Sequence, residues 1–85
     1  MALARLIPQT EIKFVLPIAG KVQLGIYDIR GHRVKQLVDQ AIEAGQHLKA
    51  WNGRSETGQI VPSGVYFARL ETEDTIVSKQ IVLLK

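Results

Sequence analysis

The sequence predicts an all-β domain built as an antiparallel β-sandwich of about six to seven short strands. Apolar and polar residues alternate with a period of two, whereas helical periodicity is nearly absent. Glycine or proline interrupts the pattern about every ten residues. A length of 85 residues fits one small domain. We therefore expect residues 1–85 to form a single domain, with residues 1–9 as an N-terminal linker or arm.

Six segments carry the alternating pattern: Thr10–Leu16, Lys21–Ile29, His32–Val38, Gln46–Trp51, Gly64–Glu71 and Thr75–Leu84. In the first segment, Ile12, Phe14 and Leu16 share one face, and Pro17 ends it. The second and third segments are predicted to form a hairpin around residues 28–31, because Asp accepts hydrogen bonds from the backbone and Gly31 tolerates positive φ.

Residues 39–43 are compatible with a short helical turn that Gly45 ends, and we expect this segment to be a connection between the sheets. The following strand places His47, Lys49 and Trp51 on one face, with Leu48 and Ala50 on the other. An acidic turn over residues 71–74 joins the last two strands.

Residues 60–66 predict how the fifth strand faces the core. Pro62 and Gly64 favour a bend, and Tyr66 follows them at the start of a strand, as in a tyrosine corner. We therefore expect the Tyr66 hydroxyl to donate to backbone a few residues upstream. Tyr66, Ala68 and Leu70 would then face the core, while Val65 and Phe67 would face outward.

Composition excludes several classes of function. The chain has no cysteine, which excludes a disulfide scaffold and a Cys nucleophile. No apolar run approaches the ~18 residues of a membrane span, so no membrane insertion is expected. The net charge is +3, but the basic residues are spread out and one Trp, two Tyr and two Phe are the only aromatics. That pattern does not favour nucleic-acid binding.

The loop after Trp51 has two interpretations. Oxygens of Asn52, Ser55 and Glu56 suggest a calcium loop, but such loops carry several carboxylates, and this one carries a single carboxylate. The favoured interpretation is an Asx-type turn in which Asn52 accepts from backbone N–H groups while Gly53 and Gly58 adopt unusual φ values. We expect no metal site and no cofactor.

His32 and His47 are the candidate general bases, but neither has a partnered nucleophile or carboxylate pair in the sequence pattern. No catalytic residue is assigned, and the protein is not expected to be an enzyme. Trp51 is interpreted as a core residue, with sugar stacking as the alternative. Phe67 and Tyr27 are the other candidates for an exposed aromatic platform.

Residues 51–70, WNGRSETGQIVPSGVYFARL, resemble the W-D-G-x-x-x-x-G-x-x-V-P-S-G-V-Y-F-x-R-L motif of a bacterial family of immunoglobulin-like domains. The resemblance extends to residues 8–17, 22–34, 44–47 and 79–85. Asn52 stands where the family has Asp. Two relatives share the motif: the C-terminal sorting domain of type IX secretion and the Ig-like domain of the flagellar hook-capping protein.

The resemblance implies an immunoglobulin-like sandwich. It makes Trp51, Asn52, Gly53, Gly58, Pro62, Gly64 and Tyr66 structural residues of the motif. The first interpretation is a sorting module that directs a larger precursor through the periplasm and across the outer membrane to the cell surface or medium. Its partners would be the secretion machinery and an upstream cargo domain. Lys79 and Lys85 are the candidate residues for recognition by that machinery. The alternatives are a structural assembly module of the hook-capping type and an adhesion or carbohydrate-binding module. A monomer is expected.

Overall fold

The computed structural model describes residues 10–84, so the expected linker at residues 1–9 and the candidate recognition residue Lys85 lie outside the described residues. Six strands follow one another: β1 (Thr10–Leu16), β2 (Gly20–Tyr27), β3 (Arg33–Ile42), β4 (Gly45–Trp51), β5 (Gly64–Glu71) and β6 (Ile76–Leu83). The predicted all-β fold is confirmed. In this part of the chain no helix is long and apolar enough to cross a membrane.

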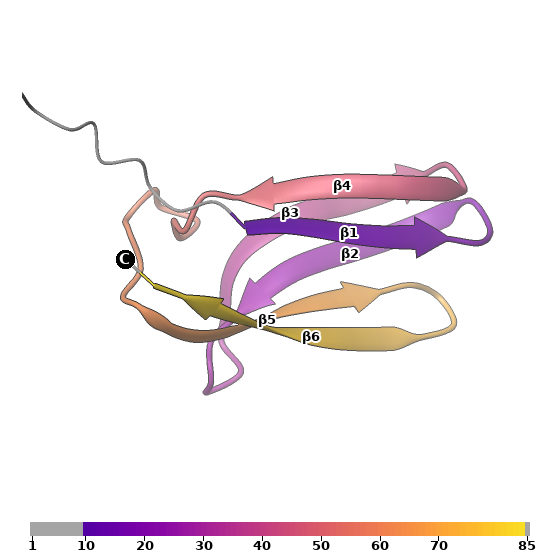
Figure 1. Cartoon of the computed structure of the whole chain (residues 1–85). Coiled ribbons are helices and arrows are strands. Elements are labelled where there is room, and N and C mark those ends of the chain that lie inside the picture. The colour runs from indigo at the N-terminus through magenta and orange to yellow at the C-terminus, as the bar shows by residue number, and fades with distance from the viewer. Residues whose placement is uncertain (1–9, 85) are drawn as a thin grey trace, which may run out of the picture.

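The strands form two antiparallel sheets of unequal width. The larger sheet has the order β3-β2-β5-β6, and the smaller one pairs β1 with β4. In Figure 1 the two strands of the smaller sheet lie over β3 and β2, and the β5–β6 hairpin extends past them. The result is an immunoglobulin-like sandwich with four strands in one layer and two in the other.

Period-two alternation places the core between the layers, as predicted. On β1, Phe14 and Leu16 are buried while Val15 is exposed, and on β2 Val22, Leu24 and Ile26 are buried. The core contains Phe14, Leu16, Val22, Leu24, Ile26, Val38, Trp51, Val61, Tyr66, Ala68, Ile81 and Leu83. No charged side chain is buried among the described residues.

The expected connection between sheets at residues 39–43 is wrong over most of its length, because β3 continues as a strand to Ile42. Val22, Lys21 and Gly20 of β2 pair with residues 40–42. A segment of five residues is too short to form a stable helix by itself, so pairing with β2 decides its conformation. Asp39 strengthens the pairing through an ion pair with Lys21, at 3.7 Å.

The β2–β3 hairpin loop forms around Asp28, as the sequence predicts. One carboxylate oxygen of Asp28 accepts from the backbone N–H groups of Arg30 and His32, both at 2.9 Å. Gly31 takes a φ of 86°, which a residue with a Cβ rarely adopts. The hydrogen bond from the His32 backbone N–H is the main cause that lowers the pKa of Asp28 below its ordinary value. The hydrogen bond from the Arg30 backbone N–H and the charges of His32 and Arg30 lower this pKa further.

Candidate functional site

The residues of the family motif gather at one end of the sandwich. We call the segment between β4 and β5, residues 52–63, the motif loop. Trp51 precedes it and is only 1% exposed. The Trp51 ring meets the Tyr66 ring edge-on, with centroids 5.3 Å apart, and its indole N–H donates to the Arg54 carbonyl at 2.9 Å. The core interpretation of Trp51 is therefore confirmed, and sugar stacking on this residue is excluded by its burial.

The motif loop begins with the predicted Asx-type turn. The Asn52 side-chain oxygen accepts from the Arg54 backbone N–H at 3.1 Å. Gly53 and Gly58 have φ values of 75° and 88°, in the left-handed region that favours glycine. The Arg54 guanidinium donates to the Gly58 carbonyl at 2.7 Å, which closes the loop from the other side. A neutral Asn is sufficient for this turn, because the contact needs an acceptor and no charge.

Tyr66 forms the predicted tyrosine corner. Its hydroxyl donates to the Pro62 carbonyl at 2.7 Å, and the ring is buried, 6% exposed. Gly64 begins β5 with a φ of 156°, at the margin of the left-handed region. Burial raises the pKa of the Tyr66 hydroxyl above its ordinary value, and the negative charge of Asp28 raises it further. The hydroxyl therefore keeps its proton and its donor role at neutral pH.

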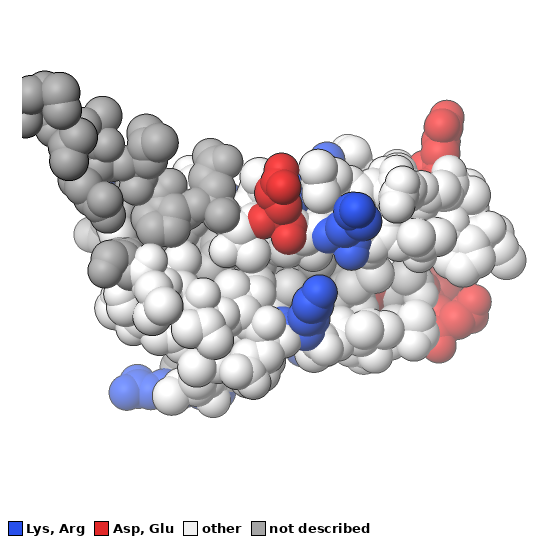
Figure 2. All heavy atoms as spheres, viewed as in Figure 1, with Lys and Arg blue, Asp and Glu red and all other residues white. Residues whose placement is uncertain are grey.

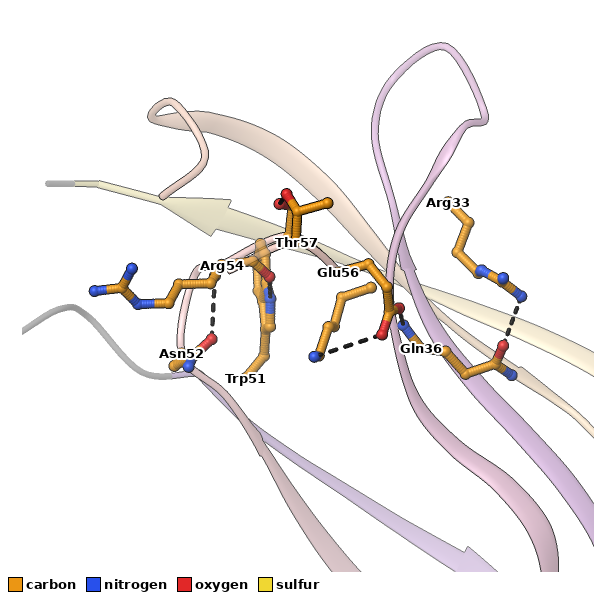
Figure 3. Close-up of polar contacts among 9 residues, drawn as sticks. Arg33, Gln36, Trp51, Asn52, Arg54, Glu56 and Thr57 are labelled. Atoms are coloured by element: carbon orange, nitrogen blue, oxygen red, sulfur yellow. Dashed lines mark hydrogen bonds and ion pairs between the residues drawn. The ribbon is translucent and has the colours of Figure 1, made fainter. Parts of the chain in front are cut away.

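Glu56 attaches the motif loop to the free edge of β3. Its backbone N–H donates to the Val34 carbonyl at 2.9 Å, and its carboxylate accepts from the Gln36 backbone N–H at 2.9 Å. The Lys35 ammonium lies 3.6 Å from the same carboxylate. Figure 3 shows Glu56 reaching from the loop to the strand that carries Gln36. One residue thus occupies a donor and an acceptor that an edge strand otherwise leaves open.

The charge of Glu56 is suited to this contact. The backbone bond from Gln36 is the largest cause that lowers the pKa of Glu56, and the charges of Lys35 and Arg33 lower it further. The carboxylate therefore stays ionised to a lower pH than an isolated Glu. The contacts of Glu56 therefore support a structural role in the loop. They do not support the alternative role as a calcium ligand.

A shallow hollow of about 480 Å³ lies between the motif loop and the β2–β3 loop. Its lining combines acidic, basic and hydroxyl side chains with the edge of Tyr66: Asp28, Arg33, Val34, Ser55, Glu56, Thr57, Val61, Pro62 and Tyr66. Ser55 and Thr57 bond to each other through their hydroxyls at 3.0 Å.

The remaining candidates are dispersed. Lys79 is exposed on β6, at the outer edge of the larger sheet, so its proposed recognition role stays a prediction. The His47 ring stacks on Phe14 with centroids 5.3 Å apart and contacts the Glu43 carbonyl at 2.7 Å. His32 lies 3.9 Å from the Asp28 carboxylate. Among residues 10–84 no three His, Asp or Glu side chains lie close enough together to hold a metal ion.

The aromatic candidates other than Trp51 lie on the outer face of the larger sheet, where Tyr27 pairs with Phe67 across β2 and β5. The Arg69 guanidinium stacks 5.3 Å above the Tyr27 ring. Gly25 makes room for this arrangement, since a Cβ there would lie 3.0 Å from the Tyr27 ring. Val65 and Phe67 also face outward, as predicted from the tyrosine corner.

The sequence did not indicate two features of the site, the anchoring of Val61 in the core and the contact of Glu56 with β3. Val61 is buried, and its backbone N–H donates to the Gly53 carbonyl, so it anchors the far side of the loop in the core. Glu56 contacts β3 by accepting from the backbone N–H of Gln36, a residue that lies 20 positions earlier in the sequence. The motif V-P-S-G-V-Y gives a signal for Val61, as an apolar residue before the corner. No local pattern gives a signal for Glu56.

The family model described as "FlgD Ig-like domain" matches residues 9–75, which is most of the chain. No curated protein matches the chain. Nothing in the family match supports the type IX sorting interpretation, which is the first one that the motif suggested.

Two solved structures share the fold. One is FlgD from P. aeruginosa, with a TM-score of 0.71 and 24% identity over 94% of this chain. The other is FlgD from Xanthomonas campestris, described as giving insights into the hook capping essential for flagellar assembly, with a TM-score of 0.68 and 27% identity over 91% of this chain. The chain spans 64% and 56% of the lengths of these two proteins.

Proposed function

The chain belongs to the FlgD Ig-like domain family, and on that premise we propose that it is a non-catalytic structural assembly module of the flagellar hook-capping type. The observation that carries the proposal is the family match over residues 9–75. The match favours the assembly interpretation over type IX sorting, although the domains of both families resemble the chain in the motif loop.

The chemistry of the described residues supports a contact role over a catalytic one. The polar groups of the motif loop bond to one another and to β3, as Asn52, Arg54 and Glu56 illustrate. Catalysis by acid and base requires a pair of groups poised toward a substrate in a pocket. The hollow beside the loop instead presents mixed charges and hydroxyls, which suits a partner protein. We propose that its partners are protein subunits outside the cytoplasm, and that it uses no cofactor.

The test replaces the Ig-like domain of the X. campestris FlgD with residues 1–85 and measures hook assembly and swimming in a strain that lacks FlgD. We expect the chimera to restore hooks. A chimera carrying Trp51→Ala, which removes the core of the module, is expected to fail. A folded, exported chimera that builds no hooks would count against the assembly role.

A second arm separates the assembly interpretation from the sorting interpretation. The domain is fused to the C-terminus of a periplasmic reporter in a host with type IX machinery. We expect the folded fusion to remain in the periplasm. Surface display of the reporter, lost on removal of residues 79–85 without loss of folding, would restore the sorting interpretation.

A further inference from the structure

The smaller sheet leaves part of the larger sheet uncovered. Immunoglobulin sandwiches commonly place three or four strands in each sheet, and here the described residues place two strands over four. β1 pairs with β4 on one side, and within residues 10–84 no strand pairs with its other side. The β5–β6 hairpin extends past that free side in Figure 1. Among residues 10–84, no strand of the smaller sheet therefore lies beyond β1 on the side of the β5–β6 hairpin.

Apolar side chains face this space. On the inner face of β6, Leu83 is 2% exposed and Ile81 is 8% exposed, but Val77 on the same face is 54% exposed. Its cross-strand partner Leu70 is only half-buried. A side chain that points toward the core layer and remains exposed indicates missing cover and not an outward-facing strand position.

A hollow of about 290 Å³ lies at the end of the uncovered region, between the β1–β2 turn and the β5–β6 turn. Its apolar lining includes Leu16, Pro17, Ile18 and Leu70, and its polar lining consists of Lys21, Thr72, Glu73, Asp74 and Thr75. Ile18 is 76% exposed and Val15 is 64% exposed. The hollow adds apolar surface at the end of β1, next to the polar residues of the β5–β6 turn.

One exposed basic side chain lies on each of the two strands that border this space. Figure 2 shows two separate basic side chains near the middle of this view, with white surface between them and an acidic side chain beside one of them. The only basic residue of β1 is the exposed Lys13, on the outer face that alternates with the buried Phe14. The only one of β6 is the exposed Lys79, on the inner face between Val77 and Ile81. Neither makes an ion pair among the described residues. An acidic residue of an added strand would therefore meet unpaired positive charge.

We propose that the free edge of β1 accepts an extended segment of another protein as a third strand of the smaller sheet. The segment carries apolar residues at alternate positions, which cover Val77 and Leu70, and an acidic residue opposite Lys13. This is strand addition to an exposed sheet edge, in which backbone bonds give affinity and alternate side chains give specificity. The inference rests on the proposed role as a protein-assembly module and names the surface and the chemistry of the partner.

A second folded copy does not fit this edge. If the β1 strands of two copies paired, the β5–β6 hairpin of each copy would occupy the space below the β1 strand of the other, where that copy's own larger sheet lies. A lone extended segment brings no second layer with it. The shape of the site thus selects an isolated strand, such as a linker or a chain terminus of the partner.

The experiment titrates the full chain, labelled with ¹⁵N, with the acetylated and amidated heptapeptide VTVEVTV while the backbone amides are followed by NMR. We expect saturable shifts at Thr10–Leu16 and around Leu70 and Val77. A matched peptide with Lys in place of Glu should bind roughly 3- to 10-fold more weakly, because it places like charges across the strand pair.

Charge-reversed variants test the register. Lys13→Glu should weaken binding of the Glu peptide about 3- to 10-fold and strengthen binding of the Lys peptide by a similar factor, as expected for a cross-strand pair. The matched control is Arg30→Glu, an exposed position in the β2–β3 loop, which should leave both affinities unchanged. Val77→Thr, which keeps the side chain's shape but adds a hydroxyl, should weaken both peptides equally.

Several outcomes would overturn the proposal. These are the absence of saturable shifts with either peptide, shifts confined to the outer edge of β6, and indifference of binding to Lys13→Glu. Binding that appears only after removal of residues 1–9 would assign the edge to this chain's own segment, and concentration-dependent dimers that compete with the peptide would assign it to a second copy. None of these outcomes alters the hook-assembly result, so the two proposals can fail separately.

Discussion

The two halves of the β5–β6 hairpin share one register but differ in what lies above them. Near the motif loop, Tyr66 pairs with Ile81 and both are buried, at 6% and 8% exposure. Toward the hairpin turn, Leu70 pairs with Val77, which is 54% exposed. All four side chains have the same parity along their strands, so they point to the same face.

The difference lies in the covering layer. The motif loop, Trp51 and Val61 close the first half, whereas no strand of residues 10–84 continues the smaller sheet beyond β1 to cover the second half. Strand formation and core formation are therefore separate outcomes in this domain. Pairing along the hairpin is complete, and burial depends on segments that come from elsewhere in the sequence.

The largest expected effect is at the closed half. Trp51→Ala removes the largest fully buried side chain and its contact with Tyr66, and we expect a loss of about 3–5 kcal/mol in the free energy of unfolding. A small domain can hold as little as ~5 kcal/mol, so the variant should be largely unfolded by circular dichroism. The control is Leu48→Ala on the same strand, because Leu48 is 53% exposed. Equal losses at the two positions would contradict the assigned facing of β4.

A pair of truncations on β6 tests the comparison directly. Ile81→Ala should cost about 2–4 kcal/mol, because it leaves a cavity in the closed half. Val77→Ala, on the same face of the same strand, should cost less than about 1 kcal/mol, since its side chain already contacts solvent and the loss is mainly β-propensity. Urea unfolding midpoints measure both. If Val77→Ala costs as much as Ile81→Ala, the open half is covered in solution and the vacancy beside β1 does not exist.

Local patterns predicted most of the closed half. Alternation located five of the six strands to within about two residues, and Pro62, Gly64 and Tyr66 together predicted a corner that the 2.7 Å hydroxyl bond confirms. The Asn52 turn was predictable for the same reason, since its acceptor and donor are two residues apart. These features depend on neighbours in the chain, and a single sequence contains them.

Features that depend on distant segments were not predictable. The extension of β3 to Ile42 follows from pairing with β2, which makes a strand of a segment that was expected to be a connection. The contact of Glu56 with β3 joins a loop to a strand 20 residues away, and an isolated Glu gives no hint of it. The open half was also missed, because the alternation of β6 is the same whether or not another strand covers it.

Tyr66→Phe should have an intermediate effect. The change removes the hydroxyl that donates to the Pro62 carbonyl and leaves that acceptor without its partner, so we expect a loss of ~1–3 kcal/mol at pH 7. Because the folded pKa of Tyr66 lies above the unfolded value of 10.0, the folded state keeps a proton that the unfolded state releases as the pH rises past 10.0. The native protein should thus lose stability above that pH, and the cost of Tyr66→Phe should shrink. A cost that is constant up to pH 11, measured by urea unfolding, would contradict the raised pKa.

The smallest expected effect concerns the edge of β3, where Glu56→Ala removes the carboxylate that accepts from the Gln36 N–H. The folded pKa of Glu56 lies below its ordinary value of 4.5, so its stabilisation is present above pH 4.5 and is lost as the pH falls through the folded value. The cost of Glu56→Ala should therefore be measurable at pH 7, smaller than that of Tyr66→Phe, and smaller again in acid. Glu56→Gln, which keeps an acceptor without the charge, should fall between the native protein and Glu56→Ala. Hydrogen exchange gives the sharper readout, because the backbone amide of Gln36 should exchange faster in Glu56→Ala than in the native protein. The control is Glu73→Ala, in the β5–β6 turn, in which the Gln36 amide should stay protected. Unchanged protection of Gln36 in Glu56→Ala would mean that the motif loop does not cover the β3 edge, and that the two edges of the larger sheet are equally open.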